Sequence, residues 1–294
     1  MKLLLACLVL LAMGALAFAA QSDLPFIGSD NDGGPVWQVG EAKYVLFGID
    51  ADTWAADAGN VDYIRQQCEA SVYCNANVLA FPVTWKNVER AGLGQYDFSF
   101  VDQVLALAEQ HGLKAIPMWV GIDYAAGDPL FVPDWVRDNP ETYTRITGFH
   151  YDEYKRYKEG WVDDGVEEDR LYCPSCPATL AAECAAYKRL VEHIAQVDTN
   201  HNVVAISVSG EINYARALNP ATWTPERDVR CQCKWCNAAY QPGTESNLAF
   251  MTGQFARYVK TLIEAGAKHL DVPTYSQVCP HNLFPGWRDR KSVV

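Results

Sequence analysis

The sequence predicts an α/β fold built on a parallel sheet, because short β-rich runs alternate along the chain with helical stretches. The runs are almost continuously apolar, as expected of strands that are covered on both faces. No G-x-G-x-x-G follows the first run, so a dinucleotide-binding version of the fold lacks support. We expect a domain of the (β/α)8 TIM-barrel type. It should be incomplete, because about five βα units are present where a barrel needs eight.

The expected elements follow one another in a regular order. Strands are expected at 43–50, 77–85, 113–121, 202–209 and 272–278, and helices around 61–70, 100–112, 179–197 and 247–266. The second of these helices has apolar residues at helical spacing, and glycines at 112 and 266 are expected to stop the second and fourth. Residues 122–172 are expected to form a long polar excursion.

The first nineteen residues have the pattern of a secretory signal peptide. Lys2 precedes an apolar run over 3–16, and Ala17-Phe18-Ala19 fits an A-x-A cleavage site. The run is too short to predict a membrane span, and no later segment is long and apolar enough. We therefore expect residues 1–19 to be a signal peptide, 20–42 a leader segment and 43–294 the partial barrel domain. The mature chain should be secreted or periplasmic.

The composition limits the partners. The formal net charge is −12 and the pI about 4.9, which argues against nucleic acid, since phosphate binding needs clustered Lys and Arg. Hydrophobic residues make up 49% of the chain, enough for a full core. Nine Trp and fifteen Tyr suit the apolar faces of sugar rings, although a large core uses them equally well.

The stretch ISVSGEINYARA at 206–217 places a carboxylate at the end of an apolar strand. The apolar residues Ile206 and Val208 are expected to be buried, and Glu211 follows Gly210. In a barrel, the chemistry lies at the carboxyl ends of the strands. Glu211 is thus a candidate catalytic residue, whereas a charged loop residue is the simpler interpretation.

Several segments resemble glycoside hydrolase family 42, whose members are β-galactosidase-like. Residues 81–119 carry a W-x-x-x-E and a G-x-Y-D-F element, followed by a helix that ends in H-G-L. VPDWVRDNPE, LYCPSCP and CQCKWC resemble further segments of that family in the same order. The resemblance runs from about 43 to 279 and covers the N-terminal barrel domain, which appears cut short after about the fifth strand.

This resemblance implies a retaining glycosidase that cleaves terminal β-galactosides, with Glu211 as the acid/base. Arg170 would bind substrate, and Trp119 could line the sugar site or belong to the core. The chain has Gly210 where the family has Asn, and it ends before the strand that carries the family's nucleophile. We assign no nucleophile, although Asp50, Asp52 and Asp123 lie near strand ends.

Two other functions stay open beside the β-galactosidase. The element SGEINY also resembles the acid region of the β-amylases, which are inverting glucan hydrolases. A truncated or non-catalytic barrel that binds glycans is the other alternative. In each case the expected partner is a carbohydrate. We expect no nucleic-acid partner and, after signal cleavage, no membrane partner. A homo-oligomer is left open.

Nine cysteines follow the signal peptide, and three of them, Cys231, Cys233 and Cys236, lie within six residues. Such close spacing suits a shared tetrahedral metal better than mutual disulfides. The resemblance implies structural Zn²⁺ with Cys173 as the fourth ligand, and Cys176 is close enough to replace it. Disulfides are the competing interpretation, which export would favour. The four other cysteines, at 68, 74, 184 and 279, are interpreted as buried fillers or a bridge.

Overall fold

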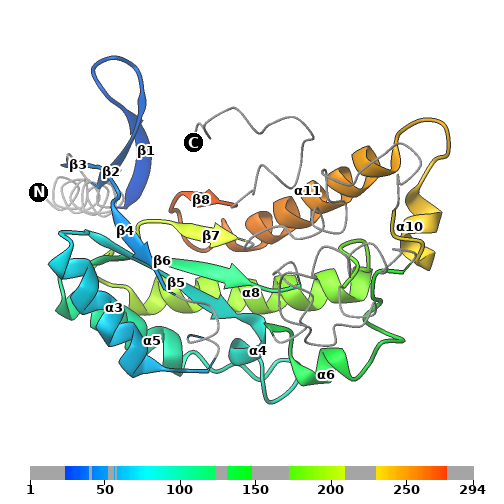
Figure 1. The fold of residues 1–294 in the computed structure, drawn as a ribbon, viewed down its shortest axis with the longest axis horizontal. Coiled ribbons are helices and arrows are strands. Elements are labelled where there is room, and N and C mark those ends of the chain that lie inside the picture. Colours follow the sequence, from blue (N-terminus) through cyan, green and yellow to red (C-terminus); the bar gives the residue numbers. More distant parts are fainter. Residues whose placement is uncertain are drawn as a thin grey trace, which may run out of the picture.

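The computed structural model describes residues 24–39, 42–51, 56, 58–122, 131–147, 172–208 and 230–276. The described chain forms a five-stranded parallel sheet and a separate three-stranded antiparallel sheet (Figure 1). The strands of the parallel sheet are β4 Gly48–Asp50, β5 Val78–Thr84, β6 Lys114–Val120, β7 Ile206–Val208 and β8 Thr274–Tyr275. Each lies within one of the five predicted runs, so these predictions are confirmed.

The order of the parallel strands is that of a barrel. Each strand pairs with the strand that precedes it in the sequence, giving the order β4-β5-β6-β7-β8. An open doubly wound sheet would instead reverse its order part-way through. The fold is therefore α/β of the barrel type, with five parallel strands in the described part.

In the described residues, four long helices connect successive strands of this sheet, and three short helices lie in the connections. The helices are α3 Val61–Tyr73, α4 Trp85–Val88, α5 Ser99–Gln110, α6 Asp134–Arg137, α8 Pro177–Val197, α10 Lys234–Ala239 and α11 Asn247–Gly266. The long helices α3, α5, α8 and α11 confirm the four that the sequence predicts. The other three span only 4 to 6 residues, too few to show a helical period.

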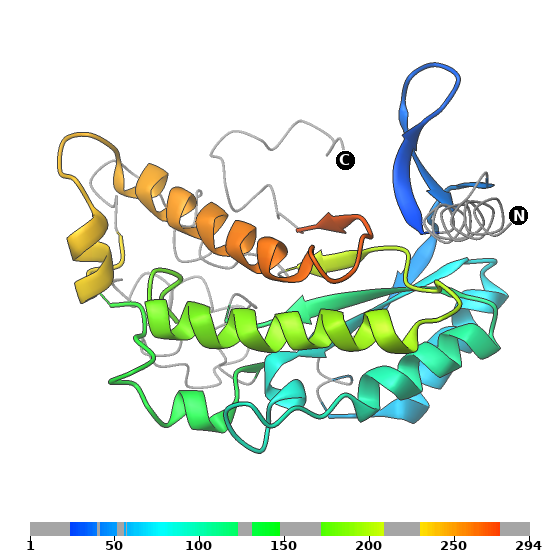
Figure 2. The same ribbon diagram turned by 180° about the vertical axis from the view of Figure 1, so that it is seen from behind.

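The two faces of the parallel sheet meet different parts of the core. Leu79, Phe81 and Trp119 belong to the large cluster that the helices share. Figure 2 shows α8 crossing in front of the strands on this side. Val78 and Ile116 belong to a smaller cluster on the inner face. Burial on both faces explains why the strands read as continuous apolar runs.

The antiparallel sheet covers the inner face near the amino ends of the parallel strands. Its strands are β1 Pro25–Ser29, β2 Pro35–Val39 and β3 Ala42–Tyr44, in the order β1-β2-β3. Trp37 and Val39 of β2 pack against the inner cluster, which contains Val78, the first residue of β5. This end of the barrel is therefore covered, and the chemistry has to be sought at the opposite, carboxyl edge.

The segment before the barrel differs from the prediction. It was expected to be a leader followed by one strand at 43–50, whereas the structure places β1 and β2 in the leader and divides the run between β3 and β4. A turn at Asp30 joins β1 to β2. The carboxylate of Asp30 accepts hydrogen bonds from the N–H groups of Asp32 and Gly34 at 2.9 and 2.7 Å, and Gly33 has a φ of 81°. The Gly/Asp-rich composition is therefore that of a hairpin turn.

Candidate functional site

Two long connections leave the carboxyl edge of the sheet. β6 ends at Val120 and the next long helix begins at Pro177, whereas β7 ends at Val208 and α11 begins at Asn247. Arg170 lies in the first connection and Glu211 in the second, both outside the described residues, as are Asp52 and Asp123. Their roles stay predictions.

A group of polar side chains lies on the inner face toward this edge. Ser207 of β7 and Tyr275 of β8 are paired in the ladder. Burial raises the pKa of Tyr275, the nearby hydroxyl of Ser207 lowers it, and the negative charge of Asp50 raises it. In a flat sheet, four strand spacings would separate Asp50 on β4 from Tyr275 by roughly 19 Å. The charge of Asp50 nevertheless acts on Tyr275, which indicates that the sheet curves.

Trp119 lies in the helix-facing core. It is fully buried, and its Nε1 donates to Oε1 of Glu183 on α8 at 3.0 Å. The hydroxyl of Tyr258 on α11 donates to the same oxygen at 2.6 Å. This is the environment of a core tryptophan, one of the two interpretations of the sequence. Contact with a sugar stays a prediction.

The W-x-x-x-E and G-x-Y-D-F elements form a hydrogen-bonded loop after β5. Glu89 is fully buried, and its carboxylate accepts from Nε1 of Trp85 at 2.8 Å and from the N–H of Gly94 at 2.5 Å. Tyr96 also hydrogen-bonds to this carboxylate. Burial raises the pKa of Glu89, whereas the three hydrogen bonds lower it. These motif residues therefore fix the path of the chain from β5 to α5.

Four cysteine thiols meet between the two long connections. Cys173 lies just before α8, and Cys231, Cys233 and Cys236 lie at or near the start of α10. All four side chains are buried, and their Sγ atoms lie within 4.8 Å of one another. Cys176 is not part of this group, because its Sγ faces the carbonyl oxygen of Thr142 at 3.5 Å.

The sulfur distances fit a metal better than a disulfide. The Sγ of Cys173 lies 3.4 Å from that of Cys236, 3.5 Å from that of Cys233 and 3.9 Å from that of Cys231. A disulfide bond is about 2.05 Å long, whereas tetrahedral zinc with bonds of about 2.3 Å sets its sulfurs roughly 3.8 Å apart. Among the residues that the structure describes, all eight cysteines are free.

The thiols interact strongly with one another. The pKa of Cys233 is lowered because Cys173, and then Cys231 and Cys236, hydrogen-bond to its sulfur. The pKa of Cys173 is raised, first by its hydrogen bond to Cys231. Four thiolates in this buried space would require a cation.

Residues 144–147 tie the two cysteine-bearing segments together. The carbonyl oxygen of Thr144 accepts a hydrogen bond from the N–H of Cys173 at 3.0 Å. The side-chain hydroxyl of Thr144 accepts one from Nε1 of Trp235 at 3.1 Å. The carbonyl oxygen of Thr147 accepts the N–H of Gln232 at 2.7 Å. The cysteine cluster therefore lies where both long connections and this segment meet.

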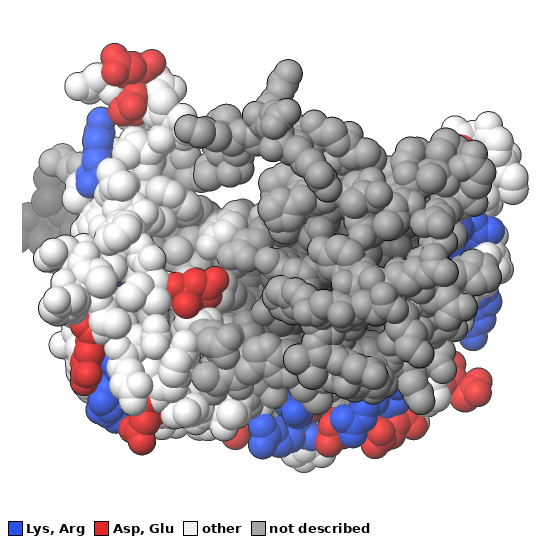
Figure 3. Space-filling view, in the orientation of Figure 1, with Lys and Arg blue, Asp and Glu red and all other residues white. Residues whose placement is uncertain are grey.

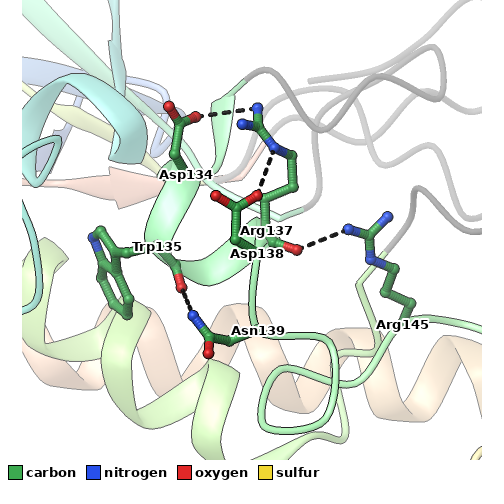
Figure 4. Close-up of polar contacts among 6 residues, drawn as sticks. All are labelled: Asp134, Trp135, Arg137, Asp138, Asn139 and Arg145. Atoms are coloured by element: carbon green, nitrogen blue, oxygen red, sulfur yellow. Dashed lines mark hydrogen bonds and ion pairs between the residues drawn. The ribbon is translucent and has the colours of Figure 1, made fainter.

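The chain that leads into this segment is held by further polar contacts around α6 (Figure 4). Arg137 pairs with Asp134 at 3.1 Å and with Asp138 at 3.4 Å. Arg145 donates to the carbonyl oxygen of Arg137 at 3.1 Å. Arg145 therefore anchors the chain beside the cysteine centre to the end of α6.

The residues that surround the sulfur atoms were not predicted from the sequence. The N–H of Cys231 points to Sδ of Met251 at 3.4 Å, and the Sγ of Cys236 lies 3.5 Å from Oγ of Ser175. Ser175 could have been found, since it lies between two cysteines in LYCPSCP. Met251 lies on α11 and has no signal in the sequence.

Charged side chains of both signs are mixed on the face that Figure 3 shows. In Figure 3, blue side chains alternate with red ones along the rim, and the described part of this face carries no broad basic area. Among the described residues, no helix combines the length and the apolar character needed to cross a bilayer.

The solved structures to which this chain is similar have low sequence identity with it. No family model and no curated protein matches the sequence. Among solved structures, the catalytic domain of the β-amylase from Paenibacillus polymyxa is similar with a TM-score of 0.46 and 13% identity, over 73% of this chain and 62% of that one. An exo-β-1,4-mannosidase from Opitutaceae bacterium strain TAV5 gives a TM-score of 0.42 and 15% identity, over 80% of this chain and 32% of that one. The chain thus spans less than two thirds of either structure.

Proposed function

We propose that the chain is a retaining glycoside hydrolase of the β-galactosidase-like type, with Glu211 as its acid/base. The observation that carries the proposal is the place of β7. This strand lies inside a barrel-type sheet and ends at Val208, three positions before Glu211. Barrel enzymes carry their catalytic residues at this edge.

The alternation of side chains along β7 also supports Glu211 as the acid/base. Ser207 faces inward with Tyr275, whereas Ile206 and Val208 belong to the helix-facing core. Because side chains alternate with a period of two, a strand continued through residue 211 would direct Glu211 to the side of Ser207. The acid would then share the inner face with Asp50, the one acidic residue in the described parallel strands.

In the proposed reaction, Glu211 donates its proton to the glycosidic oxygen as the bond to the anomeric carbon breaks. A second carboxylate attacks that carbon, and water later replaces it after giving a proton to Glu211. Among the described residues, Asp50 is the candidate for the second carboxylate. Tyr275, on whose pKa the charge of Asp50 acts, can hydrogen-bond to sugar hydroxyls.

We propose that Cys173, Cys231, Cys233 and Cys236 bind one Zn²⁺. Four thiolates leave no open position on the metal, so the ion would have a structural role. It would hold the two long connections together.

The test is hydrolysis of aryl β-galactosides by the wild type and by Glu211→Gln. Loss of an acid/base is expected to lower turnover by roughly 10²-fold or more. Glu264→Gln is the matched control, since this exposed glutamate pairs only at long range with Lys260, at 3.7 Å. Equal rates for the wild type and Glu211→Gln would remove Glu211 from the reaction.

The configuration of the released sugar separates the two hydrolase types. Retention supports the β-galactosidase-like reaction, and inversion of an α-glucan product supports the β-amylase alternative suggested by SGEINY. Binding of glycans without turnover would favour the non-catalytic alternative.

A further inference from the structure

A chain of polar contacts leads from the cysteine centre to α11. The Sγ of Cys236 lies 3.5 Å from Oγ of Ser175, and this hydroxyl donates to Oε1 of Gln254 at 2.9 Å. Nη1 of Arg257 donates to the same Oε1 at 3.2 Å. The side chain of Gln254 is buried in the interface between α11 and the cysteine-bearing segment.

The donors and acceptors fix the direction of each of these bonds. A guanidinium group has donors only, so the atom of Gln254 that it contacts must be the oxygen. The hydroxyl of Ser175 has a single hydrogen, which it gives to this oxygen. Toward Cys236 it can then only accept, so this arrangement belongs to a metal-free centre in which Cys236 is a thiol.

A metal-bound thiolate reverses the last contact, because it accepts hydrogen bonds and has none to give. We propose that Ser175 is a positioning residue of the metal centre, whose hydroxyl turns to donate to the Sγ of Cys236 when the ion is bound. Oε1 of Gln254 then loses the hydrogen bond from Ser175 and keeps the one from Arg257. The inference rests on the zinc centre of the proposed function.

The hydroxyl of Ser175 would affect the affinity for the metal, because it would orient one ligand, Cys236, and hydrogen-bond to its negative charge. Partners of metal ligands typically contribute 10–100-fold to metal affinity. Ser175 is half-buried and contacts one sulfur, so we expect the low end of this range. Gln254 would act through Ser175, because its Oε1 competes with the sulfur for the hydroxyl hydrogen.

The experiment measures Zn²⁺ affinity against a competing chelator and the absorption of the Co²⁺-loaded protein. Ser175→Ala is expected to weaken Zn²⁺ binding by roughly tenfold, and Ser175→Thr to restore most of it. Gln254→Leu removes the competing acceptor and should not weaken binding, and the double variant should lose no more than Ser175→Ala alone. Thr261→Ala is the control, because it removes an α11 hydroxyl that bonds only locally, to the carbonyl oxygen of Arg257.

The outcomes distinguish this inference from the zinc proposal. A wild-type chain that binds no Zn²⁺ would overturn the zinc centre itself. A wild type that binds Zn²⁺ with unchanged affinity in Ser175→Ala would overturn the role of Ser175 alone. Failure of Ser175→Thr to restore binding, or a greater loss in the double variant than in Ser175→Ala, would equally contradict it.

Discussion

Gly121 follows β6 directly and lies against the carboxylate of Glu183. A Cβ atom at this position would lie 1.6 Å from Oε1 of Glu183, the atom that accepts from Trp119 and Tyr258. Gly121→Ala must therefore displace a buried carboxylate from its partners. We expect the free energy of unfolding to fall by about 1–3 kcal/mol, measured by urea unfolding.

The same substitution in a Glu183→Ala background provides the control. With the carboxylate absent, the extra methyl group has room, so most of its cost should vanish. An equal cost in both backgrounds would show that Gly121 is required for another reason.

Glu89 gives a prediction for the pH dependence of stability. Burial raises its pKa in the folded chain, whereas the unfolded value is about 4.3. Between these two values the folded state holds the proton more tightly, so the free energy of unfolding decreases as pH rises through this interval. Glu89→Gln should remove this slope. Urea unfolding from pH 4 upward would detect it, and an unchanged slope in the variant would contradict the assignment.

Helix α11 contains two glycines whose surroundings differ. A Cβ atom at Gly253 meets nothing within 4 Å, whereas one at Gly266 would lie 2.6 Å from Cε1 of Tyr187 and 2.9 Å from Cγ2 of Val191 on α8. Gly253→Ala should raise the free energy of unfolding by about 1 kcal/mol through helix propensity. Gly266→Ala should lower it by about 1–3 kcal/mol through overpacking. Thermal unfolding of the two variants would contradict this packing if both shifted in the same direction.

The helices and strands also show which features of the fold can be predicted from patterns in the sequence. The helical period predicted α5, and Gly112 ends it with a φ of 68°, as a C-terminal glycine should. Gly266 was predicted as a stop, and α11 does end there, but the contact with Tyr187 on α8 gives its physical reason. A contact between distant helices has no local signal. The division of the run 43–50 has no local signal either, because it depends on pairing between β2 and β3.

At the scale of the whole molecule, the cysteine centre joins segments that leave the barrel at different strands. Spacing within CQCKWC predicted three members of the cluster. The structure brings Cys173 to them across 58 residues and leaves Cys176 apart. The sequence left that choice open, because two cysteines three residues apart differ only in the direction that their side chains take.

Removal of the proposed metal should loosen the connection before α11. A chelator under reducing conditions is expected to speed tryptic cleavage after Arg230 and Lys234, which flank the cysteines. Cleavage after Lys260, inside α11, is the internal reference. Unchanged cleavage at the first two sites would show that the metal does not hold this connection.

The central claim is that four thiolates, with Cys173 as the fourth, form one metal centre that joins the two long connections. Metal content per chain, measured for the wild type, Cys173→Ser and Cys176→Ser, tests it most directly. We predict one zinc ion in the wild type and in Cys176→Ser, and a large loss in Cys173→Ser. Full zinc content in Cys173→Ser, or none in the wild type, would contradict the claim.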